Sequence, residues 1–230
     1  MKTTTTIASL GAALGLLACS GCAMAQDSNT LRVGLYAVFY HVKADDVSGP
    51  FVPSGVNLDV NDVQTVYLAY IRRLSPHFDF ELTAGVPPRT DTVAKGPATL
   101  GSVPYDGQVI GTVKWFAPTV LVHYKFFDES RALRPYVGVG LNYTHFFQRE
   151  STPAGDAANG GPTDLNLSDS WGPAATVGIY YHVHEAWSVI ASYSISRVSS
   201  NLTATTSGLV RRTHIDFGPQ AFVLAVGYSF

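Results

Sequence analysis

The fold of this 230-residue chain is decided by an alternation in residues 222–230, which read FVLAVGYSF. The even positions carry the large apolar side chains of Phe222, Leu224, Val226, Tyr228 and Phe230, and the odd positions carry mostly small ones. Successive side chains of a β-strand point to opposite faces, so this pattern predicts a strand with one large apolar face and one small face. Residues 78–84, 137–143 and 187–195 repeat the pattern and predict further strands of the same kind.

Aromatic residues decide between a soluble β-sandwich and a membrane barrel, because strands of both classes have one apolar face. Transmembrane barrels carry girdles of aromatic side chains at both membrane interfaces. The aromatic residues that cluster toward the ends of the predicted strands are Tyr36, Phe39, Tyr40, Phe78, Phe80, Trp115, Phe116, Tyr124, Phe126, Phe127, Tyr143, Phe146, Phe147, Trp171, Trp187, Tyr228 and Phe230. We therefore expect a membrane barrel whose large apolar face contacts lipid.

Eight segments are long enough to cross a bilayer as tilted strands, which takes about 9–11 residues each. They are residues 31–43, 62–73, 77–89, 110–127, 134–148, 171–183, 186–200 and 212–230. The connections between them alternate in length, with long ones at 44–61, 90–109, 149–170 and 201–211 and short ones at 74–76, 128–133 and 184–185. Bacterial barrels have short periplasmic turns and long extracellular loops. The sequence thus predicts an all-β fold, an eight-stranded antiparallel transmembrane β-barrel with short periplasmic turns and long extracellular loops.

The first 25 residues have the features of a cleaved secretory signal. Lys2 is a short basic region, residues 7–18 are mostly apolar, and residues 23–25 (AMA) form a small-residue cleavage site. Cleavage would leave residues 26–230 as one barrel domain in the outer membrane of a Gram-negative cell. The alternative is lipidation of Cys19, which follows a Leu-Leu-Ala sequence that loosely resembles a lipoprotein processing site.

Composition excludes several other classes of protein. Both cysteines, Cys19 and Cys22, lie inside the predicted signal, so the mature chain holds no disulfide scaffold. No later stretch contains the roughly 18 consecutive apolar residues that a helical membrane span requires. The formal net charge is −2 and no basic patch is present, so we expect no nucleic-acid partner. Charged residues make up only 14% of the chain, which indicates a surface short of charge.

Four motifs together resemble the OmpW family of small outer-membrane β-barrels, which includes the alkane-uptake protein AlkL. They are residues 114–119 (KWFAPT), 135–143 (PYVGVGLNY), 167–172 (LSDSWG) and 227–230 (GYSF). The resemblance implies an eight-stranded barrel that passes small hydrophobic molecules through an apolar interior and out through a gap in its wall. It also implies that the barrel-assembly machinery reads the terminal Phe230, and that some members serve as phage or bacteriocin receptors.

A barrel of eight strands has a lumen that side chains nearly fill. A route for an apolar solute would therefore need small or weakly polar inward residues. The lumen-lining candidates are Thr83, Gly138, Gly140, Asn142, Ala174, Gly178, Ser192, Ser194, Ala225 and Gly227. The alternative for each small residue is that it only lets a narrow barrel close and curve.

Prolines mark the candidate exit from the barrel. Pro87 and Pro88 adjoin near the outer end of the third predicted strand, and neither can donate a hydrogen bond to a sheet. Two in a row should open the wall, unless the strand has already left the bilayer there. Pro118 is a weaker candidate for the same lateral exit, because a lone proline is more often a bulge.

Five ionisable residues are expected to face the lumen by strand parity. They are Asp79, Glu81, Arg89, His123 and Lys125. A buried charge without a partner is very costly, so we expect them to form ion pairs that plug the periplasmic end. Gating of a solute is the alternative role.

Catalysis and metal binding are not expected. No Gly-x-Ser-x-Gly or other nucleophile motif accompanies the seven histidines, and no cofactor motif is present. The expected function is passive outer-membrane uptake of small hydrophobic molecules, with lipopolysaccharide, membrane lipid and the solute as partners. The alternative is a non-transporting surface barrel with a closed lumen, acting in adhesion, in envelope protection or as a phage or bacteriocin receptor.

Overall fold

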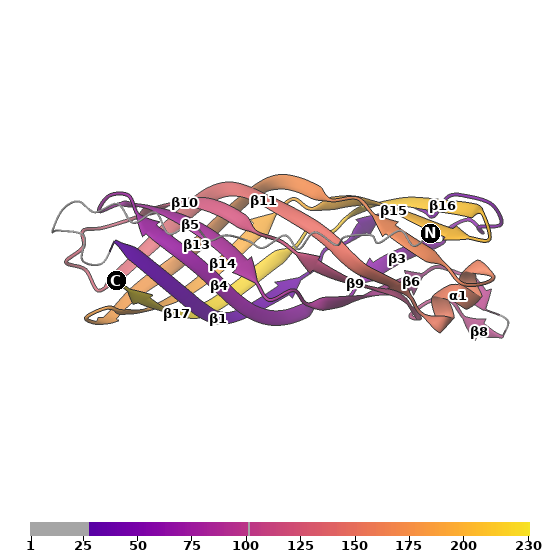
Figure 1. Cartoon of the computed structure of the whole chain (residues 1–230), viewed down its shortest axis with the longest axis horizontal. Coiled ribbons are helices and arrows are strands. Elements are labelled where there is room, and N and C mark those ends of the chain that lie inside the picture. The colour runs from indigo at the N-terminus through magenta and orange to yellow at the C-terminus, as the bar shows by residue number, and fades with distance from the viewer. Residues whose placement is uncertain (1–27, 101) are drawn as a thin grey trace, which may run out of the picture.

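Eight antiparallel strands form a closed barrel in the computed structural model, which describes residues 28–100 and 102–230 (Figure 1). The barrel strands are β1 (Asn29–Phe39), β4 (Val63–Arg73), β5 (Phe78–Gly85), β10 (Thr119–Lys125), β11 (Leu133–Ser151), β13 (Ser170–His184), β14 (Trp187–Ser196) and β17 (Gln220–Ser229). The predicted all-β, eight-stranded barrel is confirmed. The predicted signal peptide, residues 1–25, lies outside the described residues, and so does Cys19.

The barrel closes because each wall strand pairs with a neighbour on both sides. β1 lies between β17 and β4, with Leu35 opposite Leu224 on one side and Val66 on the other. The ring continues through β14, β13 and β11, and β11 pairs with β10, which returns through β5 to β4. In hydrocarbon there is no water to satisfy backbone N–H and C=O groups, so a strand can span the membrane only in such a closed ladder.

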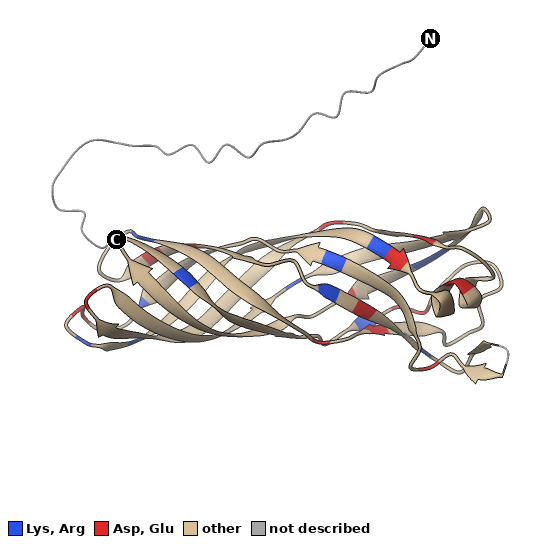
Figure 2. Ribbon diagram, turned by 60° about the horizontal axis from the view of Figure 1, so that its bottom comes forward, with Lys and Arg blue, Asp and Glu red and all other residues tan. Residues whose placement is uncertain are grey.

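The outer face of the barrel is apolar, as the alternation predicted. Leu224 is 56% exposed, whereas the next residue, Ala225, is 2% exposed and faces the lumen. Trp187 contacts Tyr228 at the end of this band nearest the short turns. Charged residues lie mostly toward the two ends of the molecule, and few of them interrupt the middle of the barrel wall (Figure 2). This distribution matches a wall that contacts lipid around its middle.

The short connections and the C-terminus lie at one end of the molecule, and the long connections lie at the other (Figure 1). The short ones are residues 74–77, 126–132 and 185–186, so this end faces the periplasm. Among the described residues, no helix has the length and hydropathy that a helical membrane span requires.

The long extracellular connections are more ordered than the sequence indicated. They contain further strands that continue the wall outward: β2 (Lys43–Ala44), β3 (Asn57–Val60), β6 (Arg89–Lys95), β9 (Val109–Phe116), β12 (Asp164–Leu167), β15 (Ser199–Thr206) and β16 (Leu209–Asp216). The β7 (Thr99–Leu100) and β8 (Val103–Pro104) pair and the short helix α1 (Pro153–Asn159) lie at the outer tip. Residues 201–211, expected as a loop, are therefore mostly a β-hairpin.

Several predicted strands are interrupted at the boundary between the barrel and this outer extension. The interruptions are residues 40–42 after β1, 86–88 after β5, 117–118 after β9, 197–198 after β14 and 217–219 after β16. Three of these five breaks contain proline, which has no backbone N–H for the ladder. β11 alone runs 19 residues through both parts.

Four aromatic residues that were expected in the membrane girdles point inward instead. Trp115 and Phe146 are buried, and Tyr36 and Tyr40 pack against the same internal apolar cluster. The sequence placed them near strand ends, which is also where the lumen of the barrel meets the outer extension. The girdle prediction is wrong for these four residues, because it assumed that an aromatic side chain at a strand end faces lipid.

The lipid-facing band makes the stability of the barrel sensitive to charge at its middle. We expect Leu224→Arg to lower the free energy of unfolding by roughly 2–4 kcal/mol, the cost of an arginine at the bilayer midplane. Urea unfolding in phospholipid vesicles, followed by tryptophan fluorescence, measures this change. Ser130→Arg in an exposed periplasmic turn is the control and should alter stability by about 0.5 kcal/mol or less. Equal losses in the two variants would show that Leu224 does not face lipid.

Candidate functional site

A buried ion pair closes the lumen in the periplasmic half of the barrel. Arg32 Nη1 on β1 donates to Glu81 Oε2 on β5 at 2.7 Å, and both side chains are 5% exposed or less. The Tyr67 hydroxyl donates to the other Glu81 oxygen at 2.8 Å, and Thr83 donates to the same oxygen at 3.1 Å. Side chains of three strands thus meet at one carboxylate, and both of its oxygens accept hydrogen bonds, although Arg32 Nε is buried without a partner among the described residues.

A second ion pair lies beside the first. Lys125 Nζ on β10 contacts Asp79 Oδ2 on β5 at 2.9 Å, and its ammonium group lies 5.7 Å from the centre of the Tyr180 ring. His123 lies between the two pairs, with Nδ1 3.8 Å from Glu81 Oε2. The structure therefore brings together Asp79, Glu81, His123 and Lys125, as strand parity indicated, with Arg32 as a partner that the sequence reasoning missed. We call these five residues the charged plug.

Glycines next to the charged plug make room for its side chains. A Cβ atom at Gly138 would lie 2.3 Å from Cδ2 of His123, and one at Gly178 would lie 2.6 Å from Cζ of Tyr136. The two rings that occupy this space, those of His123 and Tyr136, are tilted by 30° with their centres 4.8 Å apart. Gly138 and Gly178 face inward as expected, but they accommodate the plug instead of lining an open passage.

Three more small lumen-lining candidates are packed against other protein atoms and do not border a cavity. A Cβ atom at Gly227 would be 2.6 Å from Ser188 Oγ, and one at Gly140 would be 1.8 Å from the backbone oxygen of Val120. Ala225 is buried in an apolar cluster that includes Ile190. These positions fit the alternative that small residues let a narrow barrel close.

Cavities occupy the lumen outward of the charged plug. Thr83, Ala174, Ser192 and Ser194 line the lower cavity, whose floor includes Glu81. A middle cavity follows and shares Tyr36, Ser196 and Pro219 with the lower one; Asn142 lies in its wall and donates to Thr119 at 2.8 Å. Of the ten lumen-lining candidates, Thr83, Asn142, Ala174, Ser192 and Ser194 are therefore the ones that border open space.

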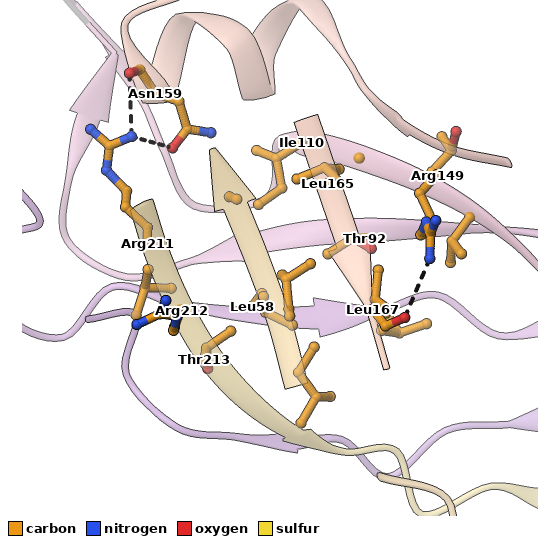
Figure 3. Close-up of a pocket in the computed structure, with 18 of the residues that line it drawn as sticks. Leu58, Thr92, Ile110, Arg149, Asn159, Leu165, Leu167, Arg211, Arg212 and Thr213 are labelled. Atoms are coloured by element: carbon orange, nitrogen blue, oxygen red, sulfur yellow. Dashed lines mark hydrogen bonds between the residues drawn. The ribbon is translucent and has the colours of Figure 1, made fainter. Parts of the chain in front are cut away.

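An outer cavity continues the series into the extracellular part. It shares Val60, Val113 and Phe217 with the middle cavity. Leucines from three outer strands supply much of its apolar lining, as Leu58 and Leu165 illustrate (Figure 3). Three adjoining cavities thus lead from the extracellular strands down to the charged plug. The outer and middle ones are largely apolar, whereas threonine and serine side chains make the lower one mixed.

The wall is interrupted beside the middle cavity. The ladder between β5 and β10 ends where Thr83 lies opposite Thr119, and the ladder between β6 and β9 begins where Arg89 lies opposite Lys114. Between these points, residues 84–88 and 115–118 do not pair with each other. Each segment is still bonded to the strand on its other side. Val86 N donates to Val66 O, Phe116 pairs with His145, and the Pro118 carbonyl accepts from Tyr143 N. We call this interruption the wall gap.

The three predicted exit prolines lie on the two edges of the wall gap. Pro87 and Pro88 belong to the segment after β5, and Pro118 belongs to the segment before β10. None of them can donate a backbone hydrogen bond across the gap. The lone Pro118, the weaker candidate by sequence, therefore faces the other two from the opposite edge.

Trp115 spans the outer side of the wall gap. Its indole Nε1 on β9 donates to Thr90 Oγ1 on β6 at 3.0 Å, and both residues are buried. Thr90, Trp115 and Ala117 also line the middle cavity. The bond therefore lies where the middle cavity meets the wall gap. Sequence reasoning missed this role, although the motif that contains Trp115 was part of the family resemblance.

Arg89 is not in the lumen, and its assignment to the internal ion pairs is wrong. Its side chain is 40% exposed, and its guanidinium pairs with Glu150 Oε2 at 2.8 Å on the outer surface. The neighbouring Thr90, which is 2% exposed, faces inward instead. Parity counted along residues 77–89 fails because the strand is broken at residues 86–88, so the alternation does not continue across the prolines.

A polar cluster lies on the outer surface where β13 begins. Tyr143 Oη donates to Asp169 Oδ2 at 2.6 Å, and His145 Nδ1 lies 2.9 Å from Asp169 Oδ1. The hydrogen bond from Tyr143 is the main cause that lowers the pKa of Asp169, and His145 contributes in the same direction. These contacts tie the start of β13 to β11. Within the described part of the chain, no group of three His, Cys, Asp or Glu side chains could hold a metal ion.

Known proteins are similar to this chain in sequence and in fold. Outer membrane protein W of Vibrio cholerae is 32% identical over 200 residues, which cover 87% of this chain and 87% of that protein. Outer membrane protein AlkL of Ectopseudomonas oleovorans is 25% identical over 186 residues, or 80% of this chain and 73% of that protein. The crystal structure of OprG from Pseudomonas aeruginosa has a TM-score of 0.79 at 22% identity and covers 89% of this chain and 97% of its own. The profile of the OmpW family matches residues 27–230, and the chain is therefore a member of the OmpW family of outer-membrane β-barrel proteins.

Proposed function

We propose that this barrel is a passive channel for small hydrophobic molecules, which enter from the extracellular side and leave sideways through the wall gap into the membrane. The observation that carries the proposal is the position of the wall gap beside the middle cavity. The cavity and the gap share Trp115 and Ala117, so a molecule in the lumen has membrane lipid on the other side of an unpaired stretch of wall.

The charged plug supports a lateral route over an axial one. An apolar solute that continued toward the periplasm would have to displace Glu81 from Arg32 and Tyr67. Separating a buried ion pair costs several kcal/mol because each charge is left without its partner. Leaving through the wall gap requires no such separation, since the gap lies outward of Glu81 along β5.

The lining above the plug supports an apolar solute. The residues around the middle cavity include Val38, Val60, Phe146 and Phe217, which form part of one internal apolar cluster. Transfer of apolar surface from water into such a lining is favourable at about 25 cal/mol per Å2. The resemblance to AlkL supports alkanes as one class of solute.

Uptake of a neutral hydrocarbon tests the proposed function directly. The test uses vesicles with lipopolysaccharide in the outer leaflet, because this leaflet is the barrier that hydrophobic solutes meet. We expect the reconstituted protein to accelerate permeation of octane several-fold over protein-free vesicles, measured by an encapsulated dye that responds to apolar solutes. The rate should depend on the octane gradient alone and need no energy source. A rate equal to that of protein-free vesicles would refute the channel and favour a non-transporting surface barrel.

The prolines of the wall gap provide a second prediction. Pro87→Val/Pro88→Val restores two backbone donors and lets the strand continue, so we expect it to narrow the gap and slow octane permeation several-fold. Pro173→Val is the matched control, because Pro173 in β13 pairs with Leu141 on one side and its carbonyl accepts from Arg197 N at 3.0 Å on the other. Undiminished permeation in the double valine variant, or an equal loss in the control, would show that octane does not leave between β5 and β10.

Replacing the central carboxylate separates the plug from the solute route. Glu81→Gln leaves Arg32 charged and buried, and we expect it to lower the free energy of unfolding by about 3–5 kcal/mol. Arg32→Met/Glu81→Met removes both charges and should recover most of this loss. The control Glu129→Gln breaks an exposed pair with Arg73 and should cost about 1 kcal/mol or less.

The same variants distinguish the two routes of transport. Octane permeation should keep its wild-type rate in Glu81→Gln, because the proposed route leaves the lumen above the plug. Faster permeation in this variant would mean that the plug gates an axial route.

A further inference from the structure

We infer that the outer cavity is a binding site for amphipathic carboxylates, molecules with one hydrocarbon tail and one carboxylate group. This inference deepens the proposed function and rests on it, since it names a solute class for the same path. The observation behind it is a one-sided charge distribution. The residues that line this largely apolar cavity include Arg149, Arg211 and Arg212, and they include no aspartate or glutamate.

Arg211 is the central residue of the inferred site. It lies on β16 and is 8% exposed. Its Nη1 donates to Asn159 Oδ1 at 3.1 Å and to Asn159 O at 3.4 Å (Figure 3). Its Nε donates to Pro50 O at 3.3 Å. All these acceptors are neutral. A buried cation that is held only by neutral oxygens retains its attraction for an anion.

Arg149 repeats this arrangement on another edge of the cavity. It projects from β11, and its Nη1 donates to Leu167 O at 3.3 Å (Figure 3). The same atom donates to Phe146 O at 3.4 Å. Neither Arg149 nor Arg211 forms an ion pair with any carboxylate of the described chain. The charged plug shows the contrast, because there each buried cation faces an acidic side chain.

The space between the arginines suits a hydrocarbon tail. Leu58, Ile110, Leu165 and Leu167 project into it from three different strands (Figure 3). The cavity encloses about 80 Å3 and so holds more than one water molecule, which needs about 10–15 Å3 on this measure. A carboxylate can accept two parallel N–H bonds from one guanidinium, and a neutral alcohol or alkane cannot. The site should therefore prefer the anion to a neutral molecule with the same tail.

The test compares two eight-carbon ligands that differ in the head group. The full mature chain in lipid nanodiscs is titrated with octanoate and with 1-octanol at neutral pH by isothermal calorimetry, with empty nanodiscs subtracted. We expect wild-type protein to bind octanoate about ten times more tightly than 1-octanol. Arg211→Met should remove this preference by weakening octanoate binding about tenfold, and it should leave 1-octanol binding unchanged.

Two further variants keep the test decisive. Arg211→Lys retains the positive charge and should retain most of the preference, so it also serves if Arg211→Met does not fold. Arg197→Met removes an exposed arginine that lines none of the three cavities and should bind both ligands as wild type does. Equal affinity of wild-type protein for the two ligands, or the same loss in Arg197→Met, would overturn the inference.

Failure of this inference is distinguishable from failure of the proposed function. If octane permeates through the barrel but octanoate has no advantage in binding, the channel stands and the carboxylate site does not. If octanoate binds preferentially but octane permeation is not accelerated, the barrel is a binder and the channel is refuted.

Discussion

The wall of this protein depends on one constraint, which is that backbone N–H and C=O groups in hydrocarbon must be hydrogen-bonded within the protein. The constraint forces the eight strands to close, and β1 completes the ring by pairing with β17. It also means that any interruption of the ladder within the membrane leaves backbone groups that need another partner. Between β5 and β10 the ladder stops for several residues on each edge, and Pro87, Pro88 and Pro118 reduce the number of donors that this interruption leaves unpaired. An opening in the wall is thus made tolerable by the residues that line it.

The inside of the barrel divides into two parts with different physical chemistry. Toward the periplasm, Glu81 accepts hydrogen bonds from the Arg32 guanidinium and the Tyr67 hydroxyl, and side chains bonded to one another fill the lumen. Toward the outside, most of the wall strands are broken, and the outer strands enclose a largely apolar interior. Small residues have different roles in the two parts. Gly138 and Gly178 make room for the rings beside the plug, whereas Ala174 borders a cavity.

The sequence predicts what depends on strict alternation and fails where the alternation is interrupted. Leu224 and Ala225 were placed on the correct faces because their strand has no break between residues 220 and 229. Arg89 was placed inside by counting through Pro87 and Pro88. The β15–β16 hairpin was missed because its Thr- and Ser-rich strand has no large apolar face, although Ser207 and Gly208 form its turn with positive φ angles. Contacts such as the bond from Trp115 to Thr90 join segments far apart in the chain, and no local pattern reports them.

Buried cations in the two parts of the lumen illustrate how context decides function. Arg32 is neutralised by Glu81, so its charge stabilises the closed end of the barrel and offers little to a solute. Arg211 is as buried as Lys125, yet its nearest acceptors are the amide and carbonyl oxygens of Asn159 and the carbonyl of Pro50. Arg211 is therefore a buried cation that lacks an anionic partner, and a solute carboxylate can supply one. A cation within an apolar cavity near the outer end of the proposed path would favour binding of such a solute there. The solute would then meet the neutral lining around Trp115, and its proposed release toward the wall gap would require no charged partner.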